Sequence, residues 1–292
     1  MPLISPLTVA IQESSTATYV HTECTSKPPN YIVYIQSALP SQYPADTGFK
    51  FLSSQSAAAC TESVADAAIW LILSCFRQFT WSALAARSLS PAQFTDVTRN
   101  VAAVTHNPAG HSLGIIGLGK IGQRLAQKAS LAFDMQIMYH DIRRATPDRE
   151  AELKATFFPT LDSLLEAADC IVLATPFAGE TLMTAARFAQ MKAGSFFVNI
   201  ARGKLVDEDA LVAALESRHI AAAALDVHFN EPVVHSRLAA MRNVELLCHM
   251  AGASEESHVG FERMSMQNIL DFFETGNAIS PVNLEWLPPK PT

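Results

Sequence analysis

The sequence predicts an α/β fold built on a doubly wound parallel sheet. Two observations point to this class. Short, almost wholly apolar runs alternate with segments whose apolar residues repeat at helical spacing, and a glycine-rich turn joins one such run to the next helical segment. Strands covered on both faces are apolar throughout, and alternation of strands with helices is typical of parallel sheets with right-handed crossovers. The pattern therefore indicates one sheet with helices on both faces.

The predicted strands are short and mostly lack polar alternation. In chain order they are Tyr31–Ile35, Leu113–Leu118, Gln136–Tyr139, Cys170–Ala174, Phe196–Ile200, Ala222–Val227 and Val244–His249. The first of these stands alone in an N-terminal stretch rich in Ser, Thr and Pro, whereas the others belong to the regular alternation.

The predicted helices each gather their apolar residues on one face. They are Ser63–Phe79, Ile121–Phe133, Leu161–Ala168, Ala185–Met191, Asp209–Ser217 and Glu256–Thr275. The last one is followed by Gly276, a residue suited to the left-handed turn that ends many helices. The stretch from Arg87 to Gly110 is predicted to be a polar connection.

The composition is that of a chain with a large core, and it disfavours several classes of protein. Of the 292 residues, 49% are hydrophobic and 17% are charged, which argues against disorder. A net charge of −7 disfavours nucleic-acid binding. The most apolar stretch, Ala67 to Phe76, is about half of the ~20 residues that span a bilayer, so we expect no membrane partner. Five scattered cysteines and no recognisable leader predict a cytoplasmic protein, and no spacing of ligands predicts a metal.

The glycine motif Gly117-Leu118-Gly119-Lys120-Ile121-Gly122 lies between a predicted strand and a predicted helix. The first glycine permits a tight turn, the second lets backbone approach a pyrophosphate, and the third lets the helix pack on the strand. The helix N-terminus adds free N–H groups and the positive end of the helix dipole. In this context the motif predicts a Rossmann-type dinucleotide site.

Asp141 follows the motif by roughly the 20 residues at which an acidic side chain accepts hydrogen bonds from the adenosine ribose. The alternative is that Asp141 only caps a turn. Its charge would repel a 2′-phosphate and so favours NAD, whereas Arg143 and Arg144 close behind it keep NADP as an alternative.

Four further blocks follow the glycine motif in a fixed order. They are Asp169–Pro176, Val198–Asp207, Ala224–His228 and His249–Gly252. Together they resemble the D-isomer-specific 2-hydroxyacid dehydrogenases. Three other segments resemble more narrowly the fungal D-mandelate dehydrogenase-like branch: His106–His111, Gly260–Arg263 and Pro281–Asn283.

The resemblance implies that Arg202, Glu231 and His249 are catalytic. The planar guanidinium of Arg202 would bind the carboxylate and carbonyl of a 2-keto acid. His249 would deliver a proton to the carbonyl oxygen as hydride arrives, because an imidazole titrates near neutral pH. Glu231 would fix the tautomer of His249. Taken singly, each residue also has an ordinary explanation: an ion-paired Arg, a turn at Glu231-Pro232, or a loop histidine.

The resemblance also implies a wider cofactor site. Thr175 and Pro176 would border the pyrophosphate and ribose, the backbone at Ala201 would line the nicotinamide pocket, and Asp226 would contact the nicotinamide end. The complete predicted set is Gly117, Gly119, Lys120, Ile121, Gly122, Asp141, Thr175, Pro176, Ala201, Arg202, Asp226, His249 and Gly252.

Family members carry a separate substrate domain with a glycine-containing loop that holds the substrate carboxylate. Here the stretch before Ser63 contains one glycine, Gly48, and no such loop. We therefore expect an abbreviated substrate domain from residues 1–62 and 277–292, and an NAD-binding domain with linking helices from residues 63–276.

Two functions follow from these expectations. The first is reduction of a 2-keto acid, such as glyoxylate, hydroxypyruvate or an aromatic analogue, to the D-2-hydroxy acid. The second is a catalytically impaired dinucleotide-binding or scaffold protein. The resemblance also implies a homodimer that forms through the helix around Ser63–Arg77.

Overall fold

The computed structural model describes residues 8–13, 16–20, 31–35, 50–54 and 57–275. Contacts within the chain group it into two compact units, Met1–Cys60 with Ser254–Thr292, and Thr61–Ala253. This grouping differs from the domain boundaries expected at residues 62 and 276, which stay a prediction because contacts alone do not define a domain. Gly48 and residues 276–292 lie outside the described residues.

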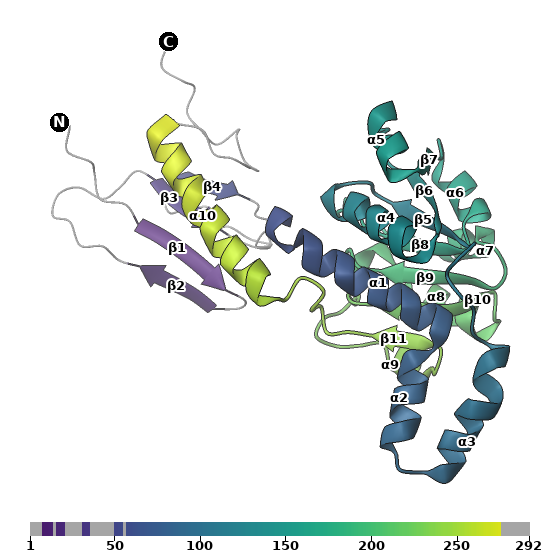
Figure 1. Cartoon of the computed structure of the whole chain (residues 1–292). Coiled ribbons are helices and arrows are strands. Elements are labelled where there is room, and N and C mark those ends of the chain that lie inside the picture. Colours follow the sequence, from purple (N-terminus) through teal and green to yellow (C-terminus); the bar gives the residue numbers. More distant parts are fainter. Residues whose placement is uncertain (1–7, 14–15, 21–30, 36–49, 55–56, 276–292) are drawn as a thin grey trace, which may run out of the picture. The chain divides into compact units, whose positions relative to one another are not determined.

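The larger unit is built on seven parallel strands in the order β11-β10-β9-β8-β5-β6-β7 (Figure 1). In chain order they are β5 Ser112–Ile116, β6 Gln136–His140, β7 Ala155–Phe157, β8 Cys170–Leu173, β9 Ser195–Asn199, β10 Ile220–Leu225 and β11 Val244–Leu246. The strand order reverses between β5 and β8, and such a switch point leaves a crevice at the carboxyl ends of the strands. The predicted doubly wound parallel sheet is confirmed.

Helices pack on the sheet in two groups. The first contains α1 (Thr61–Arg77) and α4 (Lys120–Phe133), which contact each other, while α1 also contacts β9 and β10 and α4 contacts β5 and β6. The second contains α6 (Leu161–Ala167), α7 (Ala185–Gln190) and α8 (Glu208–Glu216), which pack in series. Shorter elements complete the unit: α5 Pro147–Leu153, η3 Gly203–Leu205 and α9 Ser236–Ala240.

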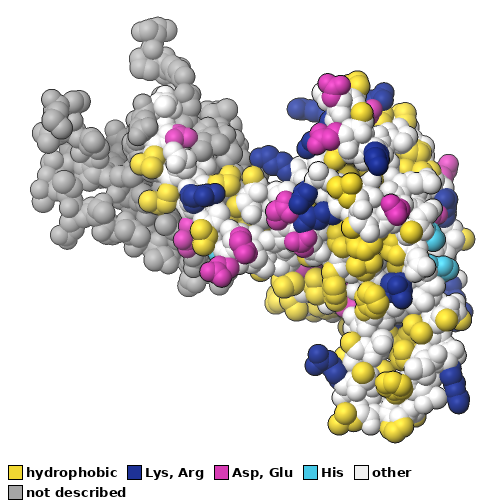
Figure 2. Space-filling model, viewed as in Figure 1, with side chains coloured by type: hydrophobic (Ala, Val, Ile, Leu, Met, Phe, Trp, Pro, Cys, Tyr) yellow, Lys and Arg dark blue, Asp and Glu magenta, His cyan; other side chains and the backbone are white. Residues whose placement is uncertain are grey.

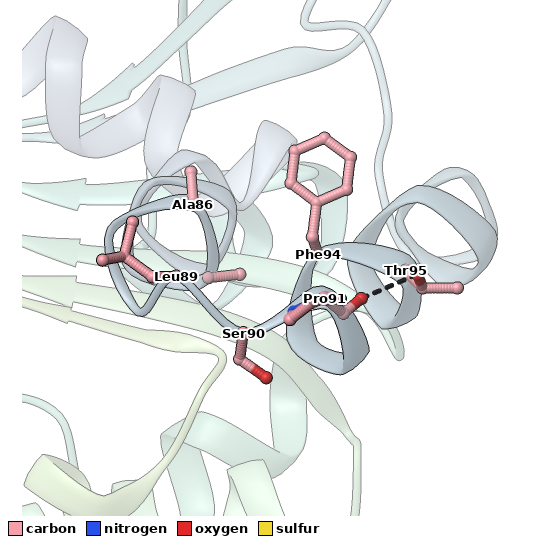
Figure 3. A pocket seen from close by; sticks show the side chains of 7 residues that line it. Ala86, Leu89, Ser90, Pro91, Phe94 and Thr95 are labelled. Atoms are coloured by element: carbon pink, nitrogen blue, oxygen red, sulfur yellow. Dashed lines mark hydrogen bonds between the residues drawn. The ribbon is translucent and has the colours of Figure 1, made fainter.

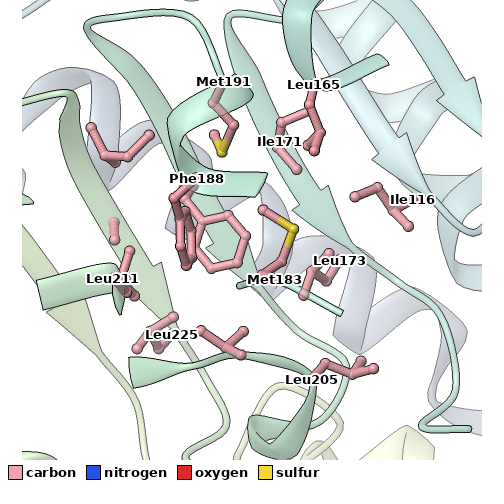
Figure 4. Packing of buried hydrophobic residues seen from close by; sticks show 14 of the residues in the cluster. Ile116, Leu165, Ile171, Leu173, Met183, Phe188, Met191, Leu205, Leu211 and Leu225 are labelled. Carbon is pink, nitrogen blue, oxygen red and sulfur yellow. The ribbon is translucent and has the colours of Figure 1, made fainter. Parts of the chain in front are cut away.

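Successive side chains of a strand point to opposite faces of the sheet, which explains why the helices pack in two groups. Ile171, Leu173 and Phe197 point into one core cluster with residues of α6, α7 and α8 (Figure 4). In that cluster the rings of Phe188 and Phe197 meet edge to face with centroids 5.2 Å apart. On β9 the neighbouring Phe196 instead lies 4.3 Å from the ring of Phe76 in α1. Because both faces are covered, the central residues of the strands are mostly apolar.

Two sequence-based expectations about residues 63–110 were wrong. The helix expected over Ser63–Phe79 ends at Arg77, because Gln78 adopts a left-handed conformation with φ of 51° before α2 (Phe79–Arg87) begins. The expected polar connection contains a helix, α3 (Pro91–Asn100), and a short turn, η2 (Val101–Ala103). Ser90 starts α3 by accepting a hydrogen bond from the backbone of the first turn, and the following proline suits that position. α3 has only ten residues, most of them polar, and it buries only Val97, so its few apolar residues are a weak signal of a helix.

The smaller unit contains a four-stranded sheet in the order β2-β1-β3-β4. Its strands are β1 Thr8–Glu13, β2 Thr16–Val20, β3 Tyr31–Ile35 and β4 Lys50–Ser54. Only β3 was predicted, since the others lack a clear apolar pattern. This unit also holds η1 (Ala57–Cys60), which packs on α10 (Glu255–Thr275). A Cβ at Gly260 of α10 would lie 2.9 Å from Ala59 Cβ, so a glycine permits this close packing.

Among the described residues, one helical stretch, Ala58–Arg77, is long and apolar enough to span a bilayer by length and composition. Its α1 part buries Ala68, Leu71, Ile72 and Phe76 within the larger unit. That burial is typical of a helix in a protein core, as expected for the apolar run in this region.

Candidate active site

The glycine motif forms the turn between β5 and α4, beside the end of β8. Gly117 has a φ of +97°, and a Cβ there would lie 2.8 Å from Ala174 O. A Cβ at Gly122 would lie 2.3 Å from Gly117 O, so only glycine lets the helix pack this closely on the turn. At Gly119, in contrast, a Cβ would meet nothing within 4 Å. Protein packing explains the first and third glycines, and the space beside the second is open to a ligand.

The start of α4 has the features of an anion site. Gly119 occupies the N-cap position and supplies no side-chain cap, so the first N–H groups of this 14-residue helix have no side-chain partner from their N-cap residue. Lys120 is exposed and Ile121 half-buried in the first turn. Thr175 and Pro176 follow β8 next to the turn, with Thr175 Cα 3.1 Å from the position of a Gly117 Cβ. These residues fit the pyrophosphate of a dinucleotide.

Asp141 lies directly after β6 and against the glycine turn. Leu118 N–H donates to its Oδ2 (2.7 Å), and Arg143 N–H donates to its Oδ1 (3.0 Å). The carboxylate is therefore half-buried where the ends of β5 and β6 meet. The second bond is the turn cap that the sequence left open as an alternative, so the ribose role of Asp141 stays a prediction.

Arg202 follows β9 in a turn that Asn199 holds. The buried Asn199 side chain accepts from Ala201 N–H and donates to Arg202 O, both at 3.0 Å. Ala201 is buried, whereas Arg202 is exposed and its Nη1 donates to Ala201 O (2.7 Å). A Cβ at Gly203 would lie 1.9 Å from the carbonyl of His228, so the loop of Arg202 packs directly on the loop that leads to Glu231.

Glu231 and His249, whose roles the resemblance implies, lie within hydrogen-bonding distance of each other. His249 Nδ1 lies 2.8 Å from Glu231 Oε2, and His228 N–H donates to Glu231 Oε1 (2.9 Å). Burial by itself raises the pKa of Glu231, but the hydrogen bonds from His249 and from the His228 backbone outweigh it and lower this pKa overall. Since an ionised carboxylate only accepts, Nδ1 carries the proton and Nε2 is left for a substrate.

Asp226 holds the backbone that carries His249. Its buried carboxylate accepts from Met250 N–H (2.8 Å) and from Ala251 N–H (3.1 Å), and its carbonyl accepts from His249 N–H (2.7 Å). His249 itself has a φ of 53°, which is uncommon for a residue other than glycine. The carboxylate thus stabilises a strained turn just before Gly252, while its contact with the nicotinamide stays a prediction.

His228 is a residue of the site that sequence reasoning did not assign. It is buried, and its Nε2 lies 2.7 Å from Leu247 O, two residues before His249. Its backbone N–H donates to Glu231, so His228 connects Glu231 to the chain segment just before His249. The signal available in the sequence was a histidine directly after the predicted strand Ala222–Val227.

The predicted catalytic residues lie after three neighbouring strands, β9, β10 and β11, whose aligned ends are Asn199, Leu225 and Leu246. Among the described residues, no group of three or more His, Cys, Asp and Glu side chains is placed to hold a metal ion.

Two surface hollows lie on the α2–α3 hairpin, away from these residues. One is lined by residues of the α2–α3 hairpin, including Ala86, Leu89 and Phe94, and it presents no titratable group (Figure 3). Exposed apolar side chains gather on the same hairpin, as the space-filling view shows (Figure 2). A hollow without a charged or titratable side chain is a poor candidate for the proton transfer of the reaction.

Comparisons with known proteins agree with this geometry. The family model for the D-isomer specific 2-hydroxyacid dehydrogenase, NAD binding domain, matches residues 69–251. Dehydrogenase efuE of Hormonema carpetanum is 37% identical over 228 residues, which are 77% of this chain and 55% of that protein. Glyoxylate/hydroxypyruvate reductase B of Citrobacter koseri is 39% identical over 225 residues, 72% of this chain and 64% of that protein. The chain thus spans less than two thirds of the length of either relative.

Among solved structures, the apo form of D-mandelate dehydrogenase from Rhodotorula graminis is similar to this chain with a TM-score of 0.80. The two are 35% identical, and the similarity covers 86% of this chain and 74% of that one.

Proposed function

This chain belongs to the D-isomer specific 2-hydroxyacid dehydrogenases, and from that premise we propose that it transfers a hydride between a nicotinamide cofactor and a 2-keto acid or D-2-hydroxy acid. The observation that carries the proposal is the hydrogen-bonded pair of Glu231 and His249, at the carboxyl ends of strands that neighbour the loop of Arg202. The names of the relatives favour glyoxylate, hydroxypyruvate or an aromatic 2-keto acid such as the oxidised form of mandelate.

When bound, the nicotinamide supplies the hydride for reduction and accepts it for oxidation. The task left to the protein is to hold the keto acid and to move one proton. Arg202 is exposed at the site and always charged, so its planar guanidinium can release Ala201 O and bind the substrate carboxylate and carbonyl. Binding both groups at once orients the carbonyl carbon.

His249 moves the proton at its Nε2. In reduction the protonated imidazole donates to the carbonyl oxygen as negative charge develops there, and in oxidation the neutral ring accepts the hydroxyl proton. Glu231 keeps the other ring nitrogen protonated in both directions, and its ionised state stabilises the imidazolium. Asp226 and His228 act through the backbone, because they hold the turn and the strand end that carry His249.

We propose NAD as the cofactor, which the match to an NAD binding domain supports. The proposed contacts are the glycine turn and Lys120 with the pyrophosphate, Asp141 with the ribose, and Ala201, Asp226 and Gly252 with the nicotinamide end. NADP is the alternative that a binding experiment distinguishes. We also propose that the protein acts in the cytoplasm as a homodimer, without a membrane or nucleic-acid partner, and that it carries an abbreviated substrate domain.

The proposal is tested by following NADH and NADPH oxidation with a panel of 2-keto acids, alongside cofactor binding measured by fluorescence. His249→Gln is expected to lower kcat by roughly 100-fold or more, because it removes the proton donor, while NADH still binds. Arg202→Ala is expected to lower kcat/KM for every keto acid, and Arg202→Lys to restore it only in part.

His235→Gln is the matched control, because His235 also pairs with a carboxylate, Asp209 at 3.2 Å, but on the surface between α8 and α9. It should leave turnover unchanged. Turnover that survives His249→Gln would contradict the proposal. NADH binding without turnover of any keto acid by the unmodified protein would favour the scaffold function instead.

A further inference from the structure

Two arginines, Arg143 and Arg144, follow Asp141, and their guanidinium groups differ in their contacts. Where a Rossmann-type site accepts NADP, an arginine close to the acidic residue after the second strand of the fold binds the 2′-phosphate. Arg143 is exposed, and only its backbone N–H is bonded to Asp141. Arg144 is paired through its guanidinium with a residue of the next helix. Of the two arginines, only Arg143 therefore has a guanidinium available to a 2′-phosphate.

The partner of Arg144 is Glu150 in α5. Arg144 Nε and Nη2 donate to the two oxygens of Glu150, each at 2.9 Å. This bidentate arrangement is the strongest geometry for an Arg–carboxylate pair. The guanidinium also lies over the ring of Phe157 in β7, with its Cζ 5.2 Å from the ring centroid. Both contacts direct Arg144 towards α5 and β7.

Glu150 is itself held in place from the sheet. Tyr139, buried in β6, donates its hydroxyl proton to Glu150 Oε1 at 2.6 Å and accepts from Ala145 N–H at 3.0 Å. The Glu150 side chain is only 13% exposed, against 61% for Arg144. Hydrogen bonds from Arg144, and then from Tyr139, lower the pKa of Glu150 to about 2, so its charge is present throughout the physiological range. The carboxylate is therefore an ionised, mostly buried partner for a more exposed guanidinium.

We propose that Glu150 helps to set the preference for NAD over NADP, by keeping the guanidinium of Arg144 paired and so unavailable to a 2′-phosphate. This inference rests on the proposed cofactor site and adds a second determinant to Asp141. Asp141 opposes the 2′-phosphate by its own charge, whereas Glu150 withholds a positive charge that would attract it. The pair is partly exposed, so Glu150 biases the preference and does not forbid NADP.

The test measures the affinities for NADH and NADPH by fluorescence titration, which requires no turnover. Asp141→Ser is the background, because it removes the direct repulsion. In that background, Glu150→Gln is expected to tighten NADPH binding by roughly tenfold and to leave NADH binding unchanged, since a freed Arg144 can bind the phosphate. Adding Arg144→Ala should cancel the gain.

Glu152→Gln is the matched control. It removes the same charge from the same helix by breaking the pair of Glu152 with Arg149, and it leaves Arg144 bound. An equal gain from Glu152→Gln, a gain that survives Arg144→Ala, or no gain from Glu150→Gln would each overturn the inference.

A second measurement does not depend on how well the Glu150 variant folds. Arg144→Ala in the otherwise unmodified protein should leave NADPH binding unchanged, because Arg144 is already withheld. If Arg144→Ala weakens NADPH binding, the inference is wrong. If the unmodified protein binds neither cofactor, the proposed function falls together with the inference, whereas normal NADH binding with an unaltered NADPH preference refutes only the inference.

Discussion

Replacing Gly119 by serine should separate folding from cofactor binding. A Cβ at Gly119 would meet nothing within 4 Å, and the backbone there (φ −70°, ψ −167°) is open to any residue. Gly119 also occupies the N-cap of α4, where serine is preferred over glycine. Gly119→Ser is therefore expected to leave the free energy of unfolding unchanged or to raise it by up to about 1 kcal/mol.

The same substitution should weaken the binding of NADH. The new side chain would occupy the space beside the turn, and its hydroxyl would compete for the N–H groups that the pyrophosphate needs. Loss of one charge-assisted hydrogen bond of about 1.5–3 kcal/mol corresponds to a rise in the Kd for NADH of roughly 10- to 100-fold. The assay combines thermal unfolding without cofactor and fluorescence titration with NADH.

Gly122→Ala is the control with the reverse expectation. Its Cβ would lie 2.3 Å from Gly117 O, a backbone atom that cannot move without displacing the turn, so we expect destabilisation by about 1–3 kcal/mol. If Gly119→Ser binds NADH as tightly as the unmodified protein, the pyrophosphate does not approach this glycine. The assignment of the glycine turn as the pyrophosphate site is then refuted.

Three further predictions concern the catalytic pair, the loop contact and acid stability. Glu231→Gln should lower kcat by about 10²-fold or more with unchanged NADH affinity, because the amide cannot stabilise a protonated His249; an unaltered kcat would contradict its role. Gly203→Ala places a Cβ 1.9 Å from the carbonyl of His228, so both the melting temperature and kcat/KM should fall, and a variant as active and stable as the parent would show that the loops do not pack this way. The pKa of Glu150 is lowered from 4.5 to about 2, so the stabilising contribution of its charge is complete above pH 4.5 and is lost as the pH falls towards 2. The melting temperatures of the parent and of Glu150→Gln should therefore converge over that interval. A constant difference would refute the assignment.

The alternation of strands and helices could be predicted because it depends on local patterns. Strands such as Cys170–Leu173 are apolar throughout, and helices such as α4 repeat their apolar residues at helical spacing. The predicted ends of strands were less accurate, because where a strand ends depends on the residues that pack against it in the tertiary structure. The strand expected over Val244–His249 stops at Leu246, since the chain turns where Asp226 binds the backbone after His249.

The pairing of Glu231 with His249 was implied by the resemblance to the family. Sheet geometry added only that both residues follow the carboxyl ends of strands, where they can lie close together. The helix α3 and the strands β1, β2 and β4 could not be predicted from the sequence. Their apolar residues do not repeat strongly enough to be detected.

What the sequence determined by itself is the class of fold, the glycine turn and the residue types at the site, all of which depend on local spacing along the chain. Only the tertiary structure decided that His228 connects Glu231 to the segment before His249, that Asp226 holds the turn of His249, and that Arg144 pairs with Glu150. The reason is physical. A hydrogen bond or an ion pair requires donors and acceptors within about 3 Å, and that distance is set by how the strands and helices pack.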